Sequence, residues 1–168
     1  MTNTSSNGDF RGDSESHPQV QFQFPSFNFI VKSTEAGRMI FDSFRQKYVR
    51  LTPEEWIRQH FLEYLVRVCR YPASLIAVEM AFEYQEMRRR ADIVVHDRFG
   101  RPFLMAECKA QDVQIVQSTF DQVSRYNRVV GARYLTVTNG VSHYCWQVDT
   151  DTGSYRFLDG IPQFGQME

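Results

Sequence analysis

The sequence lacks several features that would assign the protein to a common class. Its three cysteines form no CxxC pair, so we expect no zinc site and interpret them as reduced thiols: Cys69, Cys108 and Cys145. No apolar run approaches the roughly 20 residues of a membrane-spanning helix. No basic and then apolar leader opens the chain. These absences predict a cytoplasmic protein without a membrane partner.

An excess of positive charge is missing too. The chain has 19 Lys and Arg against 20 Asp and Glu, a net charge of −1. Nucleic-acid binding would therefore need a local basic surface, which the run Arg88, Arg89, Arg90 together with Arg125 can supply. The competing interpretation is that such a run forms a solvent-exposed rim of charged side chains with no binding role. A GxxxxGK[ST] phosphate loop is also absent, so we expect no motor within these 168 residues.

Composition predicts one folded domain behind a tail. Residues 1–20 are rich in Ser, Asn, Gly and Asp, which is typical of a disordered segment. Residues 21–168 are expected to form a single domain, since the chain is long enough to bury a layered core. Aromatic residues alternate with polar ones over residues 22–30 and predict an edge strand or extended arm. Core packing is their expected use, and stacking on nucleic-acid bases is the alternative.

Hydrophobic periodicity predicts the remaining elements. Thr52 suits a helix N-cap, Pro53 suits the first helical position, and Glu55 would complete a capping box. The apolar stripe of that helix would be Ile57, Phe61, Leu65 and Val68. Helices are predicted over 38–48, 52–71 and 114–130, and strands over 74–83, 91–95, 103–109, 134–138, 143–149 and 154–158.

The most informative stretch is the pair of apolar runs joined by residues 96–102, which contain Asp, Gly and Pro. Asp92 opens the first run, and Glu107 and Lys109 close the second. Side chains two apart on a strand share a face, so Glu107 and Lys109 should point the same way and Cys108 the other. Ionisable groups beside buried strands are costly unless they are paired or bind a metal. The stretch therefore predicts either a buried ion network or a metal-binding catalytic site.

At these residues the chain resembles the PD-(D/E)XK nuclease superfamily, with Asp92 as the first acid and Glu107-Cys108-Lys109 as the (D/E)XK motif. The series RADIVV, AECKA, TFDQV with RYN, and YLTVTNG follows in order and is similar to the N-terminal nuclease domain of type I restriction enzyme R subunits. The upstream segment LTPEEWIRQ also matches that family. The resemblance covers about residues 25–163. Ala91 replaces the proline of the first motif, which carries no chemistry.

The resemblance implies an α/β fold of the restriction-endonuclease-like kind. This is a three-layer core with a mixed central β-sheet flanked by helices, in the order α-β-β-β-α-β. It also implies that Asp92, Glu107 and the main-chain carbonyl of Cys108 bind Mg²⁺ or Mn²⁺, ions that prefer oxygen ligands. Either Glu55 or Glu63 of the first helix is a further candidate ligand. A capping role is the competing explanation for Glu55.

The resemblance also assigns roles to three other side chains. Lys109 would contact the scissile phosphate and orient or deprotonate the attacking water. Gln122 and Tyr126 lie four apart on a predicted helix and match a QxxxY motif. In that motif the glutamine supports the lysine or the substrate backbone, and the tyrosine helps to position both. The alternative is that Gln122 is a partly buried amide and Tyr126 a helix aromatic residue, and that neither has a catalytic role.

The predicted function is therefore a magnesium-dependent endodeoxyribonuclease that acts on DNA, expected to be double-stranded. A catalytically silent or partner-dependent DNA- or RNA-binding module of the same fold is the alternative. An RNase or a nuclease of branched DNA would use the same residues. One active site cuts one strand, so a homodimer would suit double-strand cleavage. Without a motor of its own, the chain either acts alone or works with separately encoded motor or specificity subunits.

Overall fold

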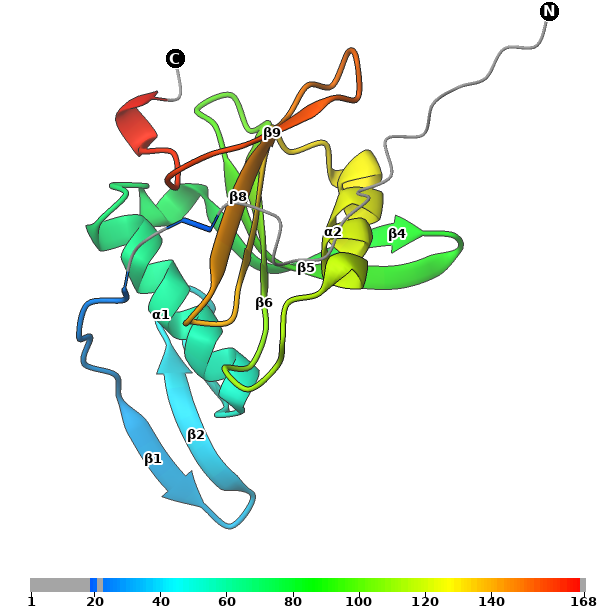
Figure 1. The fold of residues 1–168 in the computed structure, drawn as a ribbon. Coiled ribbons are helices and arrows are strands. Elements are labelled where there is room, and N and C mark those ends of the chain that lie inside the picture. The colour runs from blue at the N-terminus through cyan, green and yellow to red at the C-terminus, as the bar shows by residue number, and fades with distance from the viewer. Residues whose placement is uncertain (1–18, 21–22, 167–168) are drawn as a thin grey trace, which may run out of the picture.

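The computed structural model describes residues 19–20 and 23–166, and it confirms the predicted α/β fold (Figure 1). A six-stranded mixed sheet has the order β4-β5-β6-β7-β8-β9, and two helices cover it. The bounds are β4 (Ile76–Tyr84), β5 (Met87–His96), β6 (Pro102–Cys108), β7 (Tyr134–Thr138), β8 (His143–Val148), β9 (Tyr155–Phe157), α1 (Pro53–Arg67) and α2 (Gln117–Val130). Most predicted strand boundaries hold to within a few residues, and that of β7 is identical.

The two helices lie on opposite faces of the sheet. Strands β6 and β7 are parallel and all other neighbours are antiparallel. A parallel pair needs a crossover, which α2 supplies. Helix α1 packs on β5 and β6 over a core that contains Phe61, Leu62 and Leu65. Helix α2 packs on β4, β6 and β7 over a second core built around Phe120 and Trp146. The sheet is therefore buried on both faces near β6.

The start of α1 follows the sequence prediction only in part. Thr52 is the N-cap, and its hydroxyl accepts a hydrogen bond from the Glu55 amide at 3.1 Å, with Pro53 in the first turn. The predicted return bond of a capping box is not made, because the amide of Thr52 donates to the carbonyl of Arg50. The Glu55 carboxylate turns to other partners. Val68, predicted on the buried stripe, is 37% exposed.

The helix predicted over residues 38–48 is wrong. The chain there forms part of a second, three-stranded antiparallel sheet of β1 (Val31–Thr34), β2 (Gly37–Asp42) and β3 (Lys47–Arg50). The Asp42 carboxylate accepts hydrogen bonds from the amides of Phe44 and Arg45 and so fixes a turn in the middle of the predicted helix. Cross-strand pairing then replaces the helical hydrogen bonds.

The segment before β1 also differs from the expectation. Residues 23–30 form no regular strand. Instead, Phe24 and Phe27 pack against the core on the α1 side, which confirms packing as their use. Residues 1–18 of the predicted tail lie outside the described residues. Val20 does not belong to a tail, since it is 4% exposed and its amide donates to the carbonyl of His143 at 2.8 Å.

Two further expectations concern membranes and thiols. Among the helices that the structure describes, none has the length and apolar character required to cross a bilayer. Each of the three cysteines is buried and free of disulfides. Burial raises the pKa of both Cys69 and Cys145 to about 12, so these thiols stay protonated. The chain thus uses its cysteines as small apolar side chains.

Candidate active site

The strand that carries Asp92 is distorted at that residue. Ile93, Val94 and Val95 alternate regularly between the core under α1 and the core under α2, but Ala91, two residues before Ile93, lies in the core under α2 and not on the face of Ile93. Asp92 lies in the middle of β5, and not at its head as predicted. On the neighbouring strand β4, Glu79 lies between the residues that pair with Ala91 and Ile93, so it is opposite Asp92. The φ of Glu79 is +52°. Such backbone is uncommon outside glycine and marks a local strain.

Both oxygens of the Asp92 carboxylate are hydrogen-bonded. Oδ2 accepts from the main-chain amide of Cys108 at 2.7 Å, which ties β5 to the end of β6. Oδ1 accepts from Nη2 of Arg58 at 2.7 Å, which ties β5 to α1. The side chain is 13% exposed. Asp92 is thus held at a junction of three elements, one of them the strand of the (D/E)XK motif.

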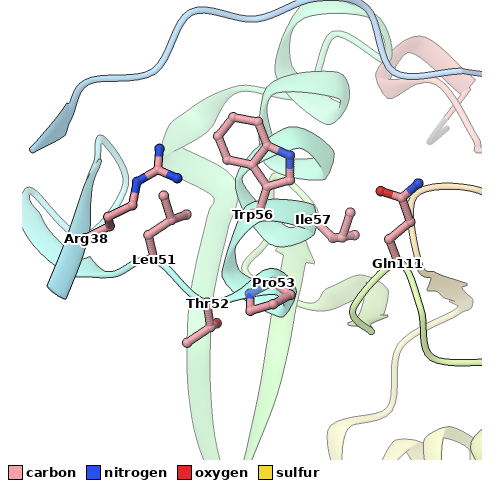
Figure 2. Close-up of a pocket in the computed structure, with 7 residues that line it drawn as sticks. All are labelled: Arg38, Leu51, Thr52, Pro53, Trp56, Ile57 and Gln111. Atoms are coloured by element: carbon pink, nitrogen blue, oxygen red, sulfur yellow. The ribbon is translucent and has the colours of Figure 1, made fainter. Parts of the chain in front are cut away.

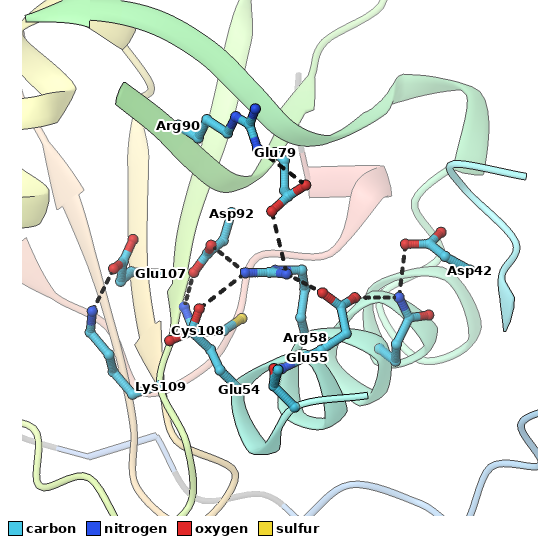
Figure 3. Close-up of polar contacts among 12 residues, drawn as sticks. Asp42, Glu54, Glu55, Arg58, Glu79, Arg90, Asp92, Glu107, Cys108 and Lys109 are labelled. Carbon is cyan, nitrogen blue, oxygen red and sulfur yellow. Dashed lines mark hydrogen bonds and ion pairs between the residues drawn. The ribbon is translucent and has the colours of Figure 1, made fainter. Parts of the chain in front are cut away.

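Glu107 and Lys109 point the same way, as predicted from their spacing. Nζ of Lys109 donates to Oε1 of Glu107 at 2.7 Å, and the Cys108 side chain lies in the α1 core (Figure 3). From α2, Nε2 of Gln122 lies 3.5 Å from the same Glu107 oxygen, at the outer limit of a hydrogen bond. Lys109, which directly follows β6, and Gln122 of α2 therefore both reach the same carboxylate oxygen of Glu107.

The electrostatics of this group are unusual. The pKa of Glu107 is raised from 4.5 to about 7, first by burial and then by the charge of Asp92, against the opposing charge and hydrogen bond of Lys109. Burial lowers the pKa of Lys109, but the charge and hydrogen bond of Glu107 outweigh it, so that pKa is raised overall. The site holds more negative charge than its own cations neutralise.

Two residues of α1 join the site that the sequence interpretation missed. Nη2 of Arg58 lies 3.2 Å from Oε1 of Glu54, so the same nitrogen bridges Glu54 and Asp92. Burial raises the pKa of Glu54, and the nearby charge of Asp92 adds to this. The available signal was the i, i+4 spacing of Glu54 and Arg58, which places them on one face of a helix. A third missed residue, the acid Glu79 of β4, lies 3.9 Å from Arg58.

The two glutamates considered as ligands lie elsewhere. Glu55 is 5% exposed and pairs with Arg45 and Arg58, on the side of Arg58 away from Glu107 (Figure 3). Glu63 pairs with Arg67 on the same helix. Within the described part of the chain, neither contacts Asp92 or Glu107. Glu54 is the α1 acid that shares one nitrogen of Arg58, Nη2, with Asp92.

Tyr126 is separated from Gln122 by one turn of α2 and faces β4. Its ring packs against Phe82 and Tyr84, with centroids 5.2 and 5.6 Å apart. The two residues of the predicted QxxxY motif therefore contact different places: the Gln122 amide reaches Glu107, and the Tyr126 ring packs on the sheet. Any role of Tyr126 in positioning the site would therefore depend on its packing against β4.

The predicted basic residues do not gather at one place. Arg90 is 61% exposed and lies 3.9 Å from Glu79, which connects it to the site. Arg88 and Arg89 lie nearer the tip of the β4–β5 hairpin, where Arg89 contacts the sulfur of Met87. Arg125 is exposed on α2. Of these four arginines, Arg90 is the one that an ion pair within the described residues connects to an acid of the site.

The donor set fits a hard divalent cation in part. No cluster of three or more His, Cys, Asp or Glu side chains able to hold a metal occurs among the residues that the structure describes. Mg²⁺, however, often uses one or two carboxylates and completes its shell with water and substrate phosphate. Asp92 and Glu107 offer such oxygens. A cation beside Glu107 would also favour its ionised carboxylate, against the burial and the charge of Asp92 that raise its pKa.

Comparison with known proteins places the chain in a family. The model of the type I restriction enzyme R protein N terminus (HSDR_N) matches residues 53–162. A solved fragment assigned to the HsdR subunit of a type I restriction enzyme from Vibrio vulnificus YJ016 is 20% identical, with a TM-score of 0.40. That alignment covers 55% of this chain and 19% of the other, too little to support an argument about the site. No curated protein matches. Because the family match spans more than half of the chain, the protein belongs to the type I restriction enzyme R protein N-terminus family.

Proposed function

We propose that this chain is a metal-dependent endonuclease of the PD-(D/E)XK kind that hydrolyses phosphodiester bonds in double-stranded DNA. The observation that carries the proposal is that Asp92, in the middle of β5, lies beside Glu107 and Lys109 at the end of β6, with Gln122 reaching the Glu107 carboxylate. Burying so many ionisable groups is an awkward way to stabilise a core, because desolvation offsets much of the Coulomb attraction. A catalytic use accounts for them better, and family membership supports a nuclease-related role.

Asp92, Glu107 and the main-chain carbonyl of Cys108 are the groups that would hold Mg²⁺ or Mn²⁺. When bound, such an ion supplies Lewis acidity and lowers the pKa of a coordinated water. Lys109 has a raised pKa and stays protonated at neutral pH, so its role is to neutralise charge on the scissile phosphate. Gln122 would hold the Glu107 carboxylate in place, and the Cys108 amide does the same for Asp92.

A second candidate function rests on Arg58. Its guanidinium already neutralises Asp92 and Glu54, which lowers the need for a metal ion at those oxygens. A catalytically silent DNA- or RNA-binding module, or a domain that becomes active only with a partner, would keep this arrangement. Metal binding separates the two candidates, because the silent module needs none.

The partners follow from the same proposal. A type I R subunit is one part of a larger enzyme, so we propose that the chain works with motor or specificity subunits in the cytoplasm. A homodimer would bring two active sites to the two strands of a duplex. Sedimentation of the chain with and without duplex DNA would report that assembly.

The first test is nicking of supercoiled plasmid with Mg²⁺ or Mn²⁺. We expect activity in the wild type, loss in Lys109→Ala and loss with a chelator. Lys47→Ala is the matched control, since Lys47 is an exposed lysine on β3. Activity that survives Lys109→Ala or the chelator would contradict the proposed mechanism. If no nicking occurs, calorimetric titration with Mn²⁺ decides, and the absence of binding that depends on Asp92 would favour the silent module.

A further inference from the structure

A pocket of about 370 Å³ lies where the three-stranded sheet of β1, β2 and β3, the first turn of α1 and the loop after β6 meet (Figure 2). Arg38 of β2, Trp56 of α1 and Gln111 of the loop contribute its polar and aromatic lining. Its volume falls within the range of about 300–1,000 Å³ that is usual for ligand pockets. The catalytic groups described above do not line it, so it is a separate feature of the molecule.

The pocket adjoins the candidate active site through the chain itself. Pro53 lines it and is followed directly by Glu54, which shares Arg58 with Asp92. Gln111 lines it and lies two residues after Lys109. Two residues span at most about 7 Å, so a strand of nucleic acid bound at Lys109 is within reach of this pocket.

Trp56 provides a rigid aromatic wall. Its side chain is 39% exposed. The rings of His60 and Phe29 contact it edge-on, with centroids 4.4 and 5.4 Å away, and so restrict its rotation. In Figure 2 the indole stands between Arg38 on one side and Gln111 on the other. An exposed ring held in this way can stack on a planar ligand at little entropic cost.

Arg38 and Gln111 have hydrogen-bonding groups to spare. Both are exposed, and neither side chain makes a hydrogen bond or an ion pair with another described residue. Arg38 lies on the same face of β2 as the buried Ile40 and Asp42, which directs it toward α1. A free guanidinium binds phosphate, and a free amide can both donate to and accept from a base edge.

We propose that this pocket binds one unpaired nucleobase of the strand that enters the active site. The base stacks on Trp56, Gln111 bonds its edge, and Arg38 holds the adjacent phosphate. The proposal rests on the nuclease function above and narrows its substrate to DNA with a single-stranded portion. A paired base cannot fill the pocket unless it leaves its stack, which costs a few kcal/mol. A base that is already unpaired binds without that cost.

The test uses the intrinsic fluorescence of the chain in the presence of a chelator, so that no DNA is cut. The chain has two tryptophans, and Trp146 is fully buried, so quenching by a short oligothymidylate reports Trp56. We expect quenching by the single strand and much less by a blunt duplex of equal length. Equal quenching by the duplex would overturn the proposal, as would no quenching by either.

Affinity for a labelled oligothymidylate, measured by anisotropy, tests the individual residues. We expect Trp56→Ala to weaken binding about 5- to 100-fold, as loss of a stacked base predicts, and Trp56→Phe to restore part of it. Arg38→Ala should weaken binding, and Arg50→Ala is its matched control. Arg50 pairs with Met39 and so faces the opposite side of the same sheet. Equal effects of Arg38→Ala and Arg50→Ala, or full affinity in Trp56→Ala, would contradict the site.

The two proposals fail separately. Binding through Trp56 without metal-dependent nicking would keep the nucleobase pocket and remove the nuclease function. If Trp56→Ala nicks a substrate with an unpaired flap as fast as the wild type does, the nuclease function stands and the nucleobase pocket is ruled out. The flap substrate is the sharper probe, because the pocket should favour it over an intact duplex of the same sequence.

Discussion

One nitrogen of Arg58 lies 2.7 Å from Asp92 and 3.2 Å from Glu54, so a single guanidinium joins acids of two different elements. Its other terminal nitrogen pairs with Glu55. Arg58 is 5% exposed, and although burial lowers its pKa, the neighbouring acids raise it well above the ordinary value. The candidate catalytic Asp92 is therefore positioned by α1 as well as by its own sheet.

Removal of Arg58 should destabilise the protein strongly. Arg58→Ala leaves the buried Asp92 carboxylate without its cation and leaves Glu55 with Arg45 alone, and breaking such a buried pair typically costs about 3–5 kcal/mol. Arg67→Ala is the matched control on the same helix. The Arg67 side chain is 66% exposed, and its pair with Glu63 should contribute about 0.5 kcal/mol or less. Urea unfolding at pH 7 measures both, and equal losses would contradict the part assigned to Arg58.

The stability effect of Glu107→Gln should depend on pH. The folded protein keeps the Glu107 proton to about pH 7, whereas the unfolded chain releases it near 4.5. The wild type therefore loses stability as the pH rises through this window, and the glutamine variant does not. We expect the variant to gain about 2–3 kcal/mol relative to wild type between pH 5 and pH 8. Urea unfolding of both at the two pH values measures this, and a constant difference would refute it.

Metal binding should release a proton from Glu107. A cation needs the ionised carboxylate, so affinity for Mn²⁺ should rise about tenfold per pH unit below pH 7 and level off above it. Calorimetry at pH 6 in two buffers of different ionisation enthalpy counts the protons released. We expect close to one for the wild type and none for Glu107→Gln. A proton count that is the same in both proteins would place the metal elsewhere.

Gln122 should matter more than a neighbouring glutamine on the same helix. Its amide reaches Oε1 of Glu107, and we expect Gln122→Ala to lower the nicking rate about tenfold, the effect of losing one useful hydrogen bond. Plasmid affinity should hardly change. Gln117 bonds Asp121 within α2 and serves as the control. If Gln117→Ala slows nicking as much, the contact with Glu107 has no special role.

Several elements could be predicted because local chemistry decides them. Thr52 and Pro53 mark the start of α1, and the apolar run of β7 ends at an Asn-Gly turn, so both boundaries follow from neighbouring residues. The common face of Glu107 and Lys109 follows from the two-residue period of a strand. None of these inferences depends on distant contacts.

Other features could not be predicted locally. Ile40, Phe41, Phe44 and Tyr48 fit a helical period, yet the turn at Asp42 makes a hairpin of their segment. The Asp42 carboxylate is fully buried and also accepts from Arg45 and from Gln59 of α1, and those partners stabilise the turn. When a sequence pattern fits both a helix and a hairpin, the tertiary contacts that each structure would make decide which one forms.

The sequence by itself determined the α/β class, the strands that carry Asp92 and Glu107, and the residue types of the candidate site. Tertiary structure alone decided that Glu54 shares Nη2 of Arg58 with Asp92, while Glu55 bridges the other terminal nitrogen of Arg58 and Arg45. Adjacent helix residues point about 100° apart, so which of them reaches the sheet depends on how α1 rotates as its apolar face packs. That rotation is fixed by the core, through contacts between residues far apart in the chain.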